Sequence, residues 1–474
     1  MSHRVTVSPS RWMTRGETII EAKEGDKPLV IWGGIPGEHS LVQLVHEGRK
    51  QVQGIWVSAA EPDPNRVTPP CPKYTTCGAC PVMHLTPKGQ QKARQELVRQ
   101  ALDKEGLSEV SIAQYHESPV GMRDFRHTIQ LSVGHSDTGR LRVGVLGRRK
   151  RHLVAIPHCA AVSPVLNRVM ASVAHHIIEM DLKPYDPVAD TGVLRSVFLR
   201  SSHSTNEVLV SLVTGRFPFL LRDFAEALAH STAEVSGVWV HINSMPSNLI
   251  FAPEDGVIGF RGLVGKQCVE EHVGGLEYLI GPGDSFWENP AMAEVLCARL
   301  LARLGVQRQT PYIDLNCGVG GFTLQGAARA GWALGVEAKE GSLARARESA
   351  HLNKLQAEFL LGEVEEVLPS LKKRYSSVAP AVVISASRRL PEGQIDDLAK
   401  LNPRKVAYVS KDPKSMAVDL KQFAAQGFQI EPVELFDMYS HTGQVECLAV
   451  CSKEISSPKR SPRRKLVRGV GGSR

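Results

Sequence analysis

The chain has 474 residues with a net charge of +8, and its 42% hydrophobic and 22% charged residues are typical of a globular protein with two or three packed domains. No run of about 18 apolar residues predicts a membrane-spanning helix, and the N-terminal MSHRVTVSPSRW lacks the apolar segment of a secretory signal. We therefore expect a soluble, cytoplasmic protein with no membrane partner.

The first predicted elements are strands between residues 28 and 58. The runs PLVIW, HSLVQLV and VQGIWV are separated by Gly-Gly and Pro-Gly turns, a pattern typical of a small β-barrel. Barrels of this size often bind RNA. We predict an RNA-binding β-barrel over residues 1–60, followed by a proline-rich connector at 61–73.

Four of the nine cysteines form a candidate metal site. Cys71, Cys77 and Cys80 follow a C-x5-C-x2-C spacing, and Cys159 comes much later. In a cytosolic chain such clustering favours a metal or iron–sulfur centre over disulfides, because thiolates are soft ligands. The spacing alone leaves an iron–sulfur cluster and zinc equally open. Four ordinary cysteines are the weaker alternative, because CPKYTTCGACP also carries the Gly and Pro that let a backbone wrap a centre. The other five are predicted to be small core residues: Cys268, Cys297, Cys317, Cys447 and Cys451.

The next segment predicts one clear helix and then a mixed region. Residues 88–106 fit an amphipathic helix with Lys and Arg on its outer face. Residues 107–284 mix short strands and helices without a decisive period. We assign residues 61–285 to a mixed α/β middle domain that carries the cysteines and binds RNA. A basic patch is predicted beside Cys159, from Arg148, Arg149, Lys150 and Arg151.

From residue 286 the pattern predicts a doubly wound α/β sheet. A helix at about 289–304 precedes the strand PYIDLN, a glycine-rich turn, a helix and the strand ALGVEA. Asp314 lies at the end of the first of these strands. Gly318, Gly320 and Gly321 form the turn, where missing side chains let a ligand approach closely.

The second strand ends in a carboxylate that indicates the ligand. Glu337 stands at the spacing where a carboxylate binds two ribose hydroxyls. The turn lacks the G-x-G-x-x-G spacing and a phosphate partner, so S-adenosylmethionine fits better than a dinucleotide. Glycines that merely pack a helix on a strand are the alternative. We predict a cofactor-binding domain over residues 286–452.

The last segment, residues 453–474, carries most of the net charge. It has eight basic residues against one glutamate, among Ser, Pro and Gly. This composition predicts a disordered basic tail that contacts phosphates without sequence preference. A merely solubilising tail is an equal alternative.

Together these motifs resemble those of the RNA uracil-5 methyltransferase family. The run from VIWGGIPGE to RVTPPCPKYTTCGACPVMHL is similar to the TRAM domain, an OB-like barrel, and the cluster-binding segment of bacterial 23S rRNA (uracil-C5) methyltransferases. RSVFLR, GDSFWENP, IDLNCGVGGFTL, VAYVSKDPKSMAVDL and FDMYSHTGQVECL resemble later motifs in the same order, so the resemblance spans about residues 28–452.

The resemblance implies a set of cofactors and partners. It implies a C-terminal class I methyltransferase domain of Rossmann-like fold that binds S-adenosylmethionine, and RNA, expected to be rRNA, as the partner of a monomeric protein. It also implies a [4Fe-4S] cluster on four ligands: Cys71, Cys77, Cys80 and Cys159.

The chemistry implied by the resemblance needs three groups. In the family a cysteine thiolate adds to uracil C6, the resulting enolate takes the methyl group, and a carboxylate removes the C5 proton. The carboxylate position matches Glu446 in DMYSHTGQVE. The nucleophile position, in a segment of the form Y-x-S-C-N, is Lys411 in YVSKD. A protonated lysine cannot start the addition.

Two other motifs depart from the family as well. The D-P-P-R loop, which helps to seat cofactor and base, reads Ser385-Ala386-Ser387-Arg388, and the glutamine of S-F-F-Q, a cofactor contact, is Glu288 in SFWENP. Neither Cys317, in the cofactor turn, nor Cys447, which should face away from Glu446, is a good substitute nucleophile.

Two hypotheses follow from these departures. The first is an S-adenosylmethionine-dependent RNA methyltransferase that acts on a different atom or through an unrecognised nucleophile. The second is a catalytically inactive protein that serves as an rRNA-binding or assembly factor.

Overall fold

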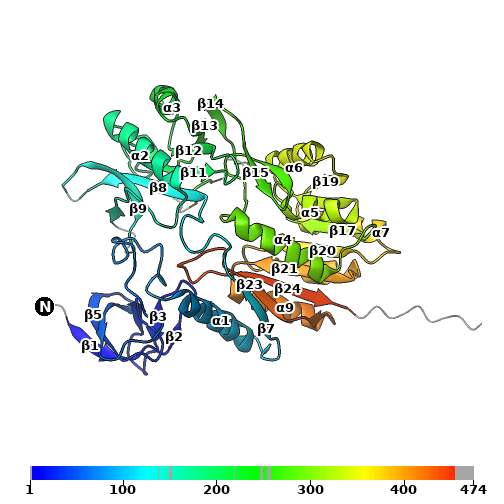
Figure 1. Cartoon of the computed structure of the whole chain (residues 1–474), viewed down its shortest axis with the longest axis horizontal. Helices are drawn as coiled ribbons and strands as arrows, with labels where there is room; N and C mark the ends of the chain where they lie inside the picture. Colours follow the sequence, from blue (N-terminus) through cyan, green and yellow to red (C-terminus); the bar gives the residue numbers. More distant parts are fainter. Residues whose placement is uncertain are drawn as a thin grey trace, which may run out of the picture.

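The computed structural model describes residues 3–136, 138–148, 152–217, 219–245, 249–252 and 258–453. The chain builds sheets of six, seven and nine strands in that order, with a two-stranded ribbon before the last sheet (Figure 1). Within the described residues, no helix has both the length and the apolar character that crossing a bilayer requires.

The N-terminal sheet has the strand order β1-β5-β6-β4-β3-β2. The three strands predicted between residues 28 and 58 are present as β4 to β6. Register shifts in the β5–β6 pair, between Leu41 and Val42 and between Leu44 and His46, strengthen the twist that curls this sheet. The strands are β1 (Arg4–Val7), β2 (Arg11–Trp12), β3 (Thr18–Ile20), β4 (Leu29–Trp32), β5 (Ser40–Glu47) and β6 (Val52–Ala59).

The middle sheet has the order β10-β9-β8-β11-β12-β13-β14, and two helices supply its core. Val169 and Val173 of α2 and Phe224 of α3 are fully buried. The helices are α2 (Pro164–Glu179) and α3 (Leu220–Ser231). The strands are β8 (Thr128–His135), β9 (Leu141–Leu146), β10 (Leu153–Val154), β11 (Leu194–Ser201), β12 (Val208–Thr214), β13 (Val235–Ile242) and β14 (Arg261–Gly265). The ribbon of β15 (Val269–Val273) and β16 (Leu276–Ile280) leads to the last sheet.

The last sheet confirms the predicted doubly wound α/β arrangement. Its order is β19-β18-β17-β20-β21-β24-β23-β7, with β22 beside β24. The run from β19 to β21 is parallel and β24 is antiparallel. The strands are β7 (Ile112–His116), β17 (Tyr312–Leu315), β18 (Ala333–Glu337), β19 (Ala357–Leu361), β20 (Ala381–Ser385), β21 (Lys405–Ser410), β22 (Gln429–Ile430), β23 (Val433–Phe436) and β24 (Glu446–Ser452).

Helices cover both faces of this sheet, so two separate buried clusters form. One cluster holds side chains of α4 (Pro290–Leu304), α5 (Gly321–Ala330) and α6 (Glu340–Leu352). The other holds side chains of α1 (Pro87–Lys104), α7 (Val364–Arg374), α8 (Gln394–Lys400) and α9 (Pro413–Ala425). The helices expected at 88–106 and 289–304 are therefore α1 and α4.

Residues 87–116 join this last sheet although they precede it by almost 200 residues. The strand β7 pairs parallel with β23, and α1 packs against α9. Local hydrophobic periodicity predicted α1 but contains no information on so distant a partner. The domain limits at residues 60, 285 and 452 stay a prediction.

Candidate active site

The carboxyl end of the last sheet brings four chain segments together. Pairing of Leu315 with Ile384, and of Ser385 with Val409, aligns the ends of β17, β20 and β21. Ser410 pairs with Cys447, so the antiparallel β24 begins at this same edge with Glu446. The order reverses direction beside β17, and ligands of such sheets bind at that switch point.

The glycine turn after β17 leaves an open backbone. Gly318 and Gly320 have φ angles of 57° and 85°, a left-handed conformation that favours glycine. A Cβ on Gly320 would lie 2.3 Å from the Leu324 side chain, and together with the positive φ this would strain any larger residue there. The Glu337 carboxylate accepts hydrogen bonds from the backbone N–H groups of Gly318 at 2.9 Å and Lys339 at 3.0 Å. This contact fixes the end of β18 beside the turn.

Asp314 lies beneath the turn and is fully buried. Its Oδ2 accepts a hydrogen bond of 2.7 Å from the Thr323 hydroxyl of α5, while the buried Oδ1 has no hydrogen-bond partner. Burial raises the pKa of this carboxyl to about 7. Asp314 therefore joins β17 to the helix that follows the turn.

The segment before α4 places Trp287 against the glycine turn. The Trp287 ring packs on Phe322 with 5.2 Å between ring centroids, and a Cβ on Gly321 would lie 2.8 Å from that indole. Glu288 follows directly, and its Oε2 forms an ion pair of 2.8 Å with the Arg126 guanidinium.

Glu446 is a buried carboxylate with a hydroxyl partner. Its side chain accepts a hydrogen bond of 2.9 Å from the Tyr439 hydroxyl. Burial raises the pKa of Glu446 to about 7, the charge of Glu288 acts in the same direction, and the Lys411 ammonium opposes both. A carboxyl group with this pKa can accept or release a proton near neutral pH.

Lys411 lies between β21 and α9 and is half-buried. The residue after it, Asp412, caps α9 by accepting a hydrogen bond of 3.1 Å from Lys414 N–H. The family's nucleophile position is therefore at this edge, near Glu446, and it carries an ammonium group.

The loop after β20, residues 385–388, also lies at the carboxyl edge of the last sheet. The Asn316 side-chain amide donates a 3.4 Å hydrogen bond to the Ser385 carbonyl. Ala386 is buried, whereas Ser387 and Arg388 are exposed. The described part of this loop offers no carboxylate where the family has one.

The two cysteines nearest the edge turn away from it. Cys447 is fully buried and packs in the cluster on the α1 side of the sheet, and Cys317 packs in the cluster on the α4 side. Four of the five cysteines predicted to be core residues are buried: Cys297, Cys317, Cys447 and Cys451. The prediction is wrong for Cys268, which is half-buried because it lies just before the ribbon strand β15.

A buried arginine of α1 holds the loop before Glu446. Arg94 forms an ion pair of 3.0 Å with Asp437 and donates hydrogen bonds to the carbonyls of Tyr439 at 3.0 Å and Thr442 at 3.1 Å. Its side chain is 0% exposed. The prediction that all basic residues of this helix face outward is therefore wrong for Arg94. The sequence could have predicted this burial, because Arg94 falls on the same face of the helix as Leu97 and Val98.

The four predicted ligand cysteines lie near one another. Burial raises the pKa of Cys80 to about 12, and the charges of the other three thiols act in the same direction. Within the described residues, no group of three or more Cys, His, Asp or Glu side chains is arranged to hold a single metal ion. We call these residues the cysteine site: Cys71, Cys77, Cys80 and Cys159.

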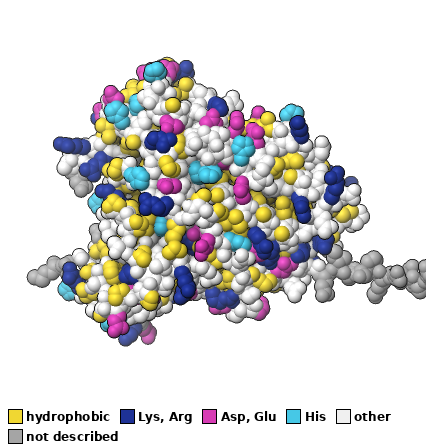
Figure 2. Space-filling view, viewed as in Figure 1, with side chains coloured by type: hydrophobic (Ala, Val, Ile, Leu, Met, Phe, Trp, Pro, Cys, Tyr) yellow, Lys and Arg dark blue, Asp and Glu magenta, His cyan; other side chains and the backbone are white. Residues whose placement is uncertain are grey.

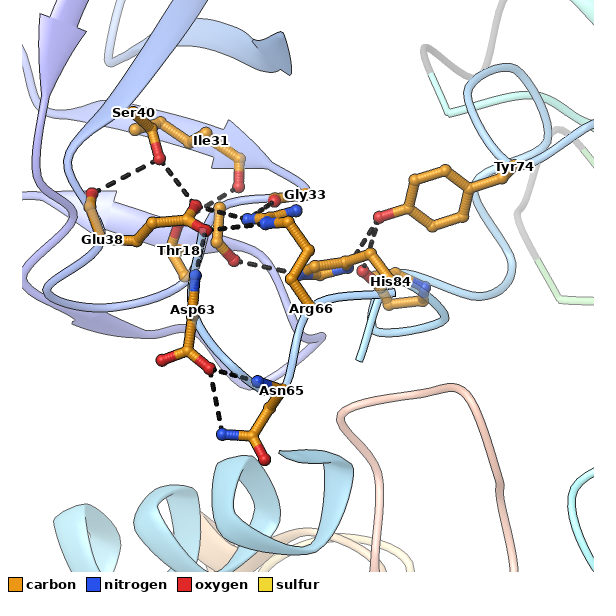
Figure 3. Close-up of polar contacts among 12 residues, drawn as sticks. Thr18, Ile31, Gly33, Glu38, Ser40, Asp63, Asn65, Arg66, Tyr74 and His84 are labelled. Carbon is orange, nitrogen blue, oxygen red and sulfur yellow. Dashed lines mark hydrogen bonds and ion pairs between the residues drawn. The ribbon is translucent and has the colours of Figure 1, made fainter. Parts of the chain in front are cut away.

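Polar contacts of Tyr74, His84 and Arg66, which flank the cysteine site in sequence, reach the N-terminal sheet, as Figure 3 shows. Tyr74, between two of the cysteines, contacts His84 Nδ1 through its hydroxyl at 2.8 Å, and His84 Nε2 lies 3.2 Å from the Gly34 carbonyl. On the connector, Arg66 donates a 2.7 Å hydrogen bond to Glu38 of the N-terminal unit. Of the predicted basic patch, Arg148 is described, and Arg149, Lys150 and Arg151 lie outside the described residues, as do residues 454–474 of the tail.

Sequence comparison finds relatives that match almost the whole chain. An uncharacterised RNA methyltransferase of Clostridium tetani is 26% identical over 441 residues, which are 92% of this chain and 93% of that protein. Another, from Gloeobacter violaceus, is 27% identical over 454 residues, covering 95% and 96% of the two chains. No profile of a known protein family matches the chain.

Structural comparison gives the same fold. The Pyrococcus abyssi tRNA (uracil-54, C5)-methyltransferase, solved in complex with S-adenosyl-L-homocysteine, superposes with a TM-score of 0.71. The match has 21% sequence identity and covers 94% of this chain and all of that one.

The last sheet is of the doubly wound α/β type, and the candidate site lies at its carboxyl edge. Over almost its whole length the chain is similar to proteins named RNA methyltransferases, and this similarity supports the family recognised in its motifs. These comparisons lend no support to the alternative of an inactive assembly factor.

Proposed function

We propose that this protein binds S-adenosylmethionine at the edge of the last sheet and transfers its methyl group to RNA. The observation that carries the proposal is the meeting of the glycine turn, Glu337 and the buried Glu446 at that edge. The relatives named RNA methyltransferases and the neighbour solved with S-adenosyl-L-homocysteine support it.

The residues present suit the donor. The backbone of Gly318 and Gly320 is open to a close ligand, and the Glu337 carboxylate stands beside it to take ribose hydroxyls. Glu288, Asp314 and the Ser385 loop border the same turn. When bound, S-adenosylmethionine supplies a methyl group on a positively charged sulfur.

We infer further that the methyl acceptor is a base nitrogen and not uracil C5. Uracil C5 becomes nucleophilic only after a group adds to C6, and the cysteines nearest the edge, Cys317 and Cys447, are buried away from it. Lys411, whose charge acts on Glu446, supplies no thiolate for that addition. A base nitrogen becomes nucleophilic as it loses its own N–H proton, so it needs no prior addition to the ring. Glu446 would take the N–H proton as the sulfur–carbon bond breaks.

The remaining parts supply contacts to RNA. We propose that residues 1–60 form a TRAM-like RNA-binding barrel and that the RNA is rRNA, bound by a monomer. On the face shown in Figure 2, Lys and Arg side chains are dispersed among Asp and Glu. The basic residues 453–474 would add phosphate contacts.

We propose that the cysteine site holds a [4Fe-4S] cluster. The four thiols lie close enough for their charges to raise one another's pKa. Four cysteine thiolates are the ligand set that a [4Fe-4S] cluster takes.

The proposed activity is tested with the purified full-length protein. Calorimetry should show S-adenosylmethionine binding, and RNA incubated with a donor labelled in its methyl group should yield an N-methylated nucleoside by mass spectrometry. RNA containing 5-fluorouridine should form no covalent adduct. Absence of donor binding would refute the function, formation of 5-methyluridine would refute the nitrogen acceptor, and RNA binding without transfer would support the assembly factor.

A further inference from the structure

The Arg126 guanidinium lies between the cysteine site and the edge of the last sheet. It pairs with Glu288 Oε2 at 2.8 Å, and it lies beside Cys80, because both residues line the same small cavity. Arg126, Cys80, Glu288 and Tyr439 line one cavity of about 20 Å³, which has room for about one water molecule. One cation therefore faces both sites across a narrow space.

The backbone around Arg126 is joined to both sides. Arg126 N–H donates to the Ala161 carbonyl at 2.9 Å, and its own carbonyl accepts from Ser163 N–H at 3.0 Å, so it is attached to the segment that follows Cys159. The next residue, His127, donates from its N–H to the Glu288 carbonyl at 3.0 Å. The backbone at Arg126 and His127 therefore connects the segment after Cys159 directly to Glu288.

The charge of Glu288 matters because of where it lies. Trp287, directly before it, packs on the start of α5, and Ser285 O would lie 3.6 Å from a Cβ on Gly318. A carboxylate here attracts a sulfonium donor and has little effect on the uncharged thioether product. Arg126 cancels part of that attraction while it pairs with Glu288.

We propose that Arg126 is a positioning residue that couples the cysteine site to the methyl-donor pocket by neutralising Glu288. The proposal rests on the proposed function. Four ligand thiolates would outweigh the 2+ charge of an oxidised iron–sulfur core, so a filled cysteine site would be net negative and would compete with Glu288 for Arg126. Filling the site then frees Glu288 and favours S-adenosylmethionine over S-adenosylhomocysteine.

The test measures the affinity of both compounds by calorimetry and takes their ratio. It compares protein as purified anaerobically with protein stripped of iron by a chelator, in the wild type, Arg126→Gln, Glu288→Gln and the control Arg123→Gln. Arg123 is an exposed arginine on the same loop. Stripping should lower the preference for the donor about five- to tenfold in the wild type and the control, the size expected for one charge in a partly solvated site.

The two variants at the pair should respond differently. Arg126→Gln should strongly prefer S-adenosylmethionine over S-adenosylhomocysteine, both as purified and after stripping. Glu288→Gln should show a weak preference for S-adenosylmethionine in both forms. A ratio that responds neither to stripping nor to Arg126→Gln would overturn the proposal, whereas failure of every form to bind either compound would refute the proposed function instead. If stripping unfolds the protein, the test uses the variants as purified, without stripping. Arg126→Gln must then prefer S-adenosylmethionine more strongly than Arg123→Gln does.

Discussion

At the scale of single residues, the site combines a buried acid with a cation in place of a nucleophile. Burial raises the pKa of Glu446 to about 7, and the Lys411 ammonium limits the rise. Because the pKa of Glu446 in the folded protein lies above the value of 4.5 for an exposed glutamate, its ionised form predominates only above about pH 7. Glu446 therefore acts as a base mainly above that pH.

The first prediction concerns the pH profile of methyl transfer. The rate should rise with pH, with its midpoint near 7, as Glu446 loses its proton. Lys411→Met removes the charge that favours the carboxylate, so the midpoint should move to higher pH. Lys414→Met is the matched control, because Lys414 is exposed on the first turn of α9. An identical midpoint in all three proteins would show that Lys411 does not act on Glu446.

At the scale of elements, α1 is a structural support of the site. Arg94 is enclosed, and it holds both the Asp437 carboxylate and the carbonyl of Tyr439, the residue whose hydroxyl contacts Glu446. A second ionic group lies nearby, where Arg299 and Arg303 of α4 meet Glu434 of β23. Buried charges therefore join helices on both faces to the strands beside β24.

The second prediction tests this support. Arg94→Met should lower the free energy of unfolding by about 3–5 kcal/mol, because it leaves Asp437 buried without its partner. Urea denaturation followed by circular dichroism measures the loss. Lys92→Met, at an exposed position of the same helix, should change stability by less than about 0.5 kcal/mol. Equal stability of the two variants would contradict the role of Arg94.

Short-range sequence patterns predicted the helices, strands and turns, but they did not predict which distant residues these contact. The glycine turn, Glu337 and α4 were predictable because strand ends, capping residues and helical spacing are encoded within a few residues. Arg126 was not, because its partner Glu288 is far along the chain. Arg94 was misplaced on the outer face, since a charged residue is expected to be exposed unless its partners are known.

At the scale of the whole molecule, the cysteine site joins parts that are separate in sequence. Three of its residues lie between the N-terminal sheet and α1, and Cys159 lies just before α2 of the middle sheet. Asn167 of α2 fixes this last cysteine through hydrogen bonds of 2.8 Å with its N–H and 3.0 Å with its carbonyl. The proposed centre would act here as a cross-link between these parts.

The third prediction follows from that cross-link. Removal of iron should increase amide hydrogen exchange in residues 66–85 and near Cys159, while β17 to β21 keep their protection. The Cys268→Ser variant is the control, because this half-buried cysteine lies outside the site. Equal exchange in the filled and stripped proteins would show that the site contributes nothing to the association of these parts.

The position of β7 at the end of the last sheet constrains the order in which this protein can fold during synthesis. The ribosome releases β7 more than 300 residues before β23, the strand it pairs with. The N-terminal and middle sheets contain only earlier residues, so they can form first, while α1 and β7 await their partners. A nascent chain halted before residue 433 would leave β7 and the apolar face of α1 without their partners, and exposed strand edges of this kind are prone to aggregation. Completion of the last sheet is therefore among the last events of translation.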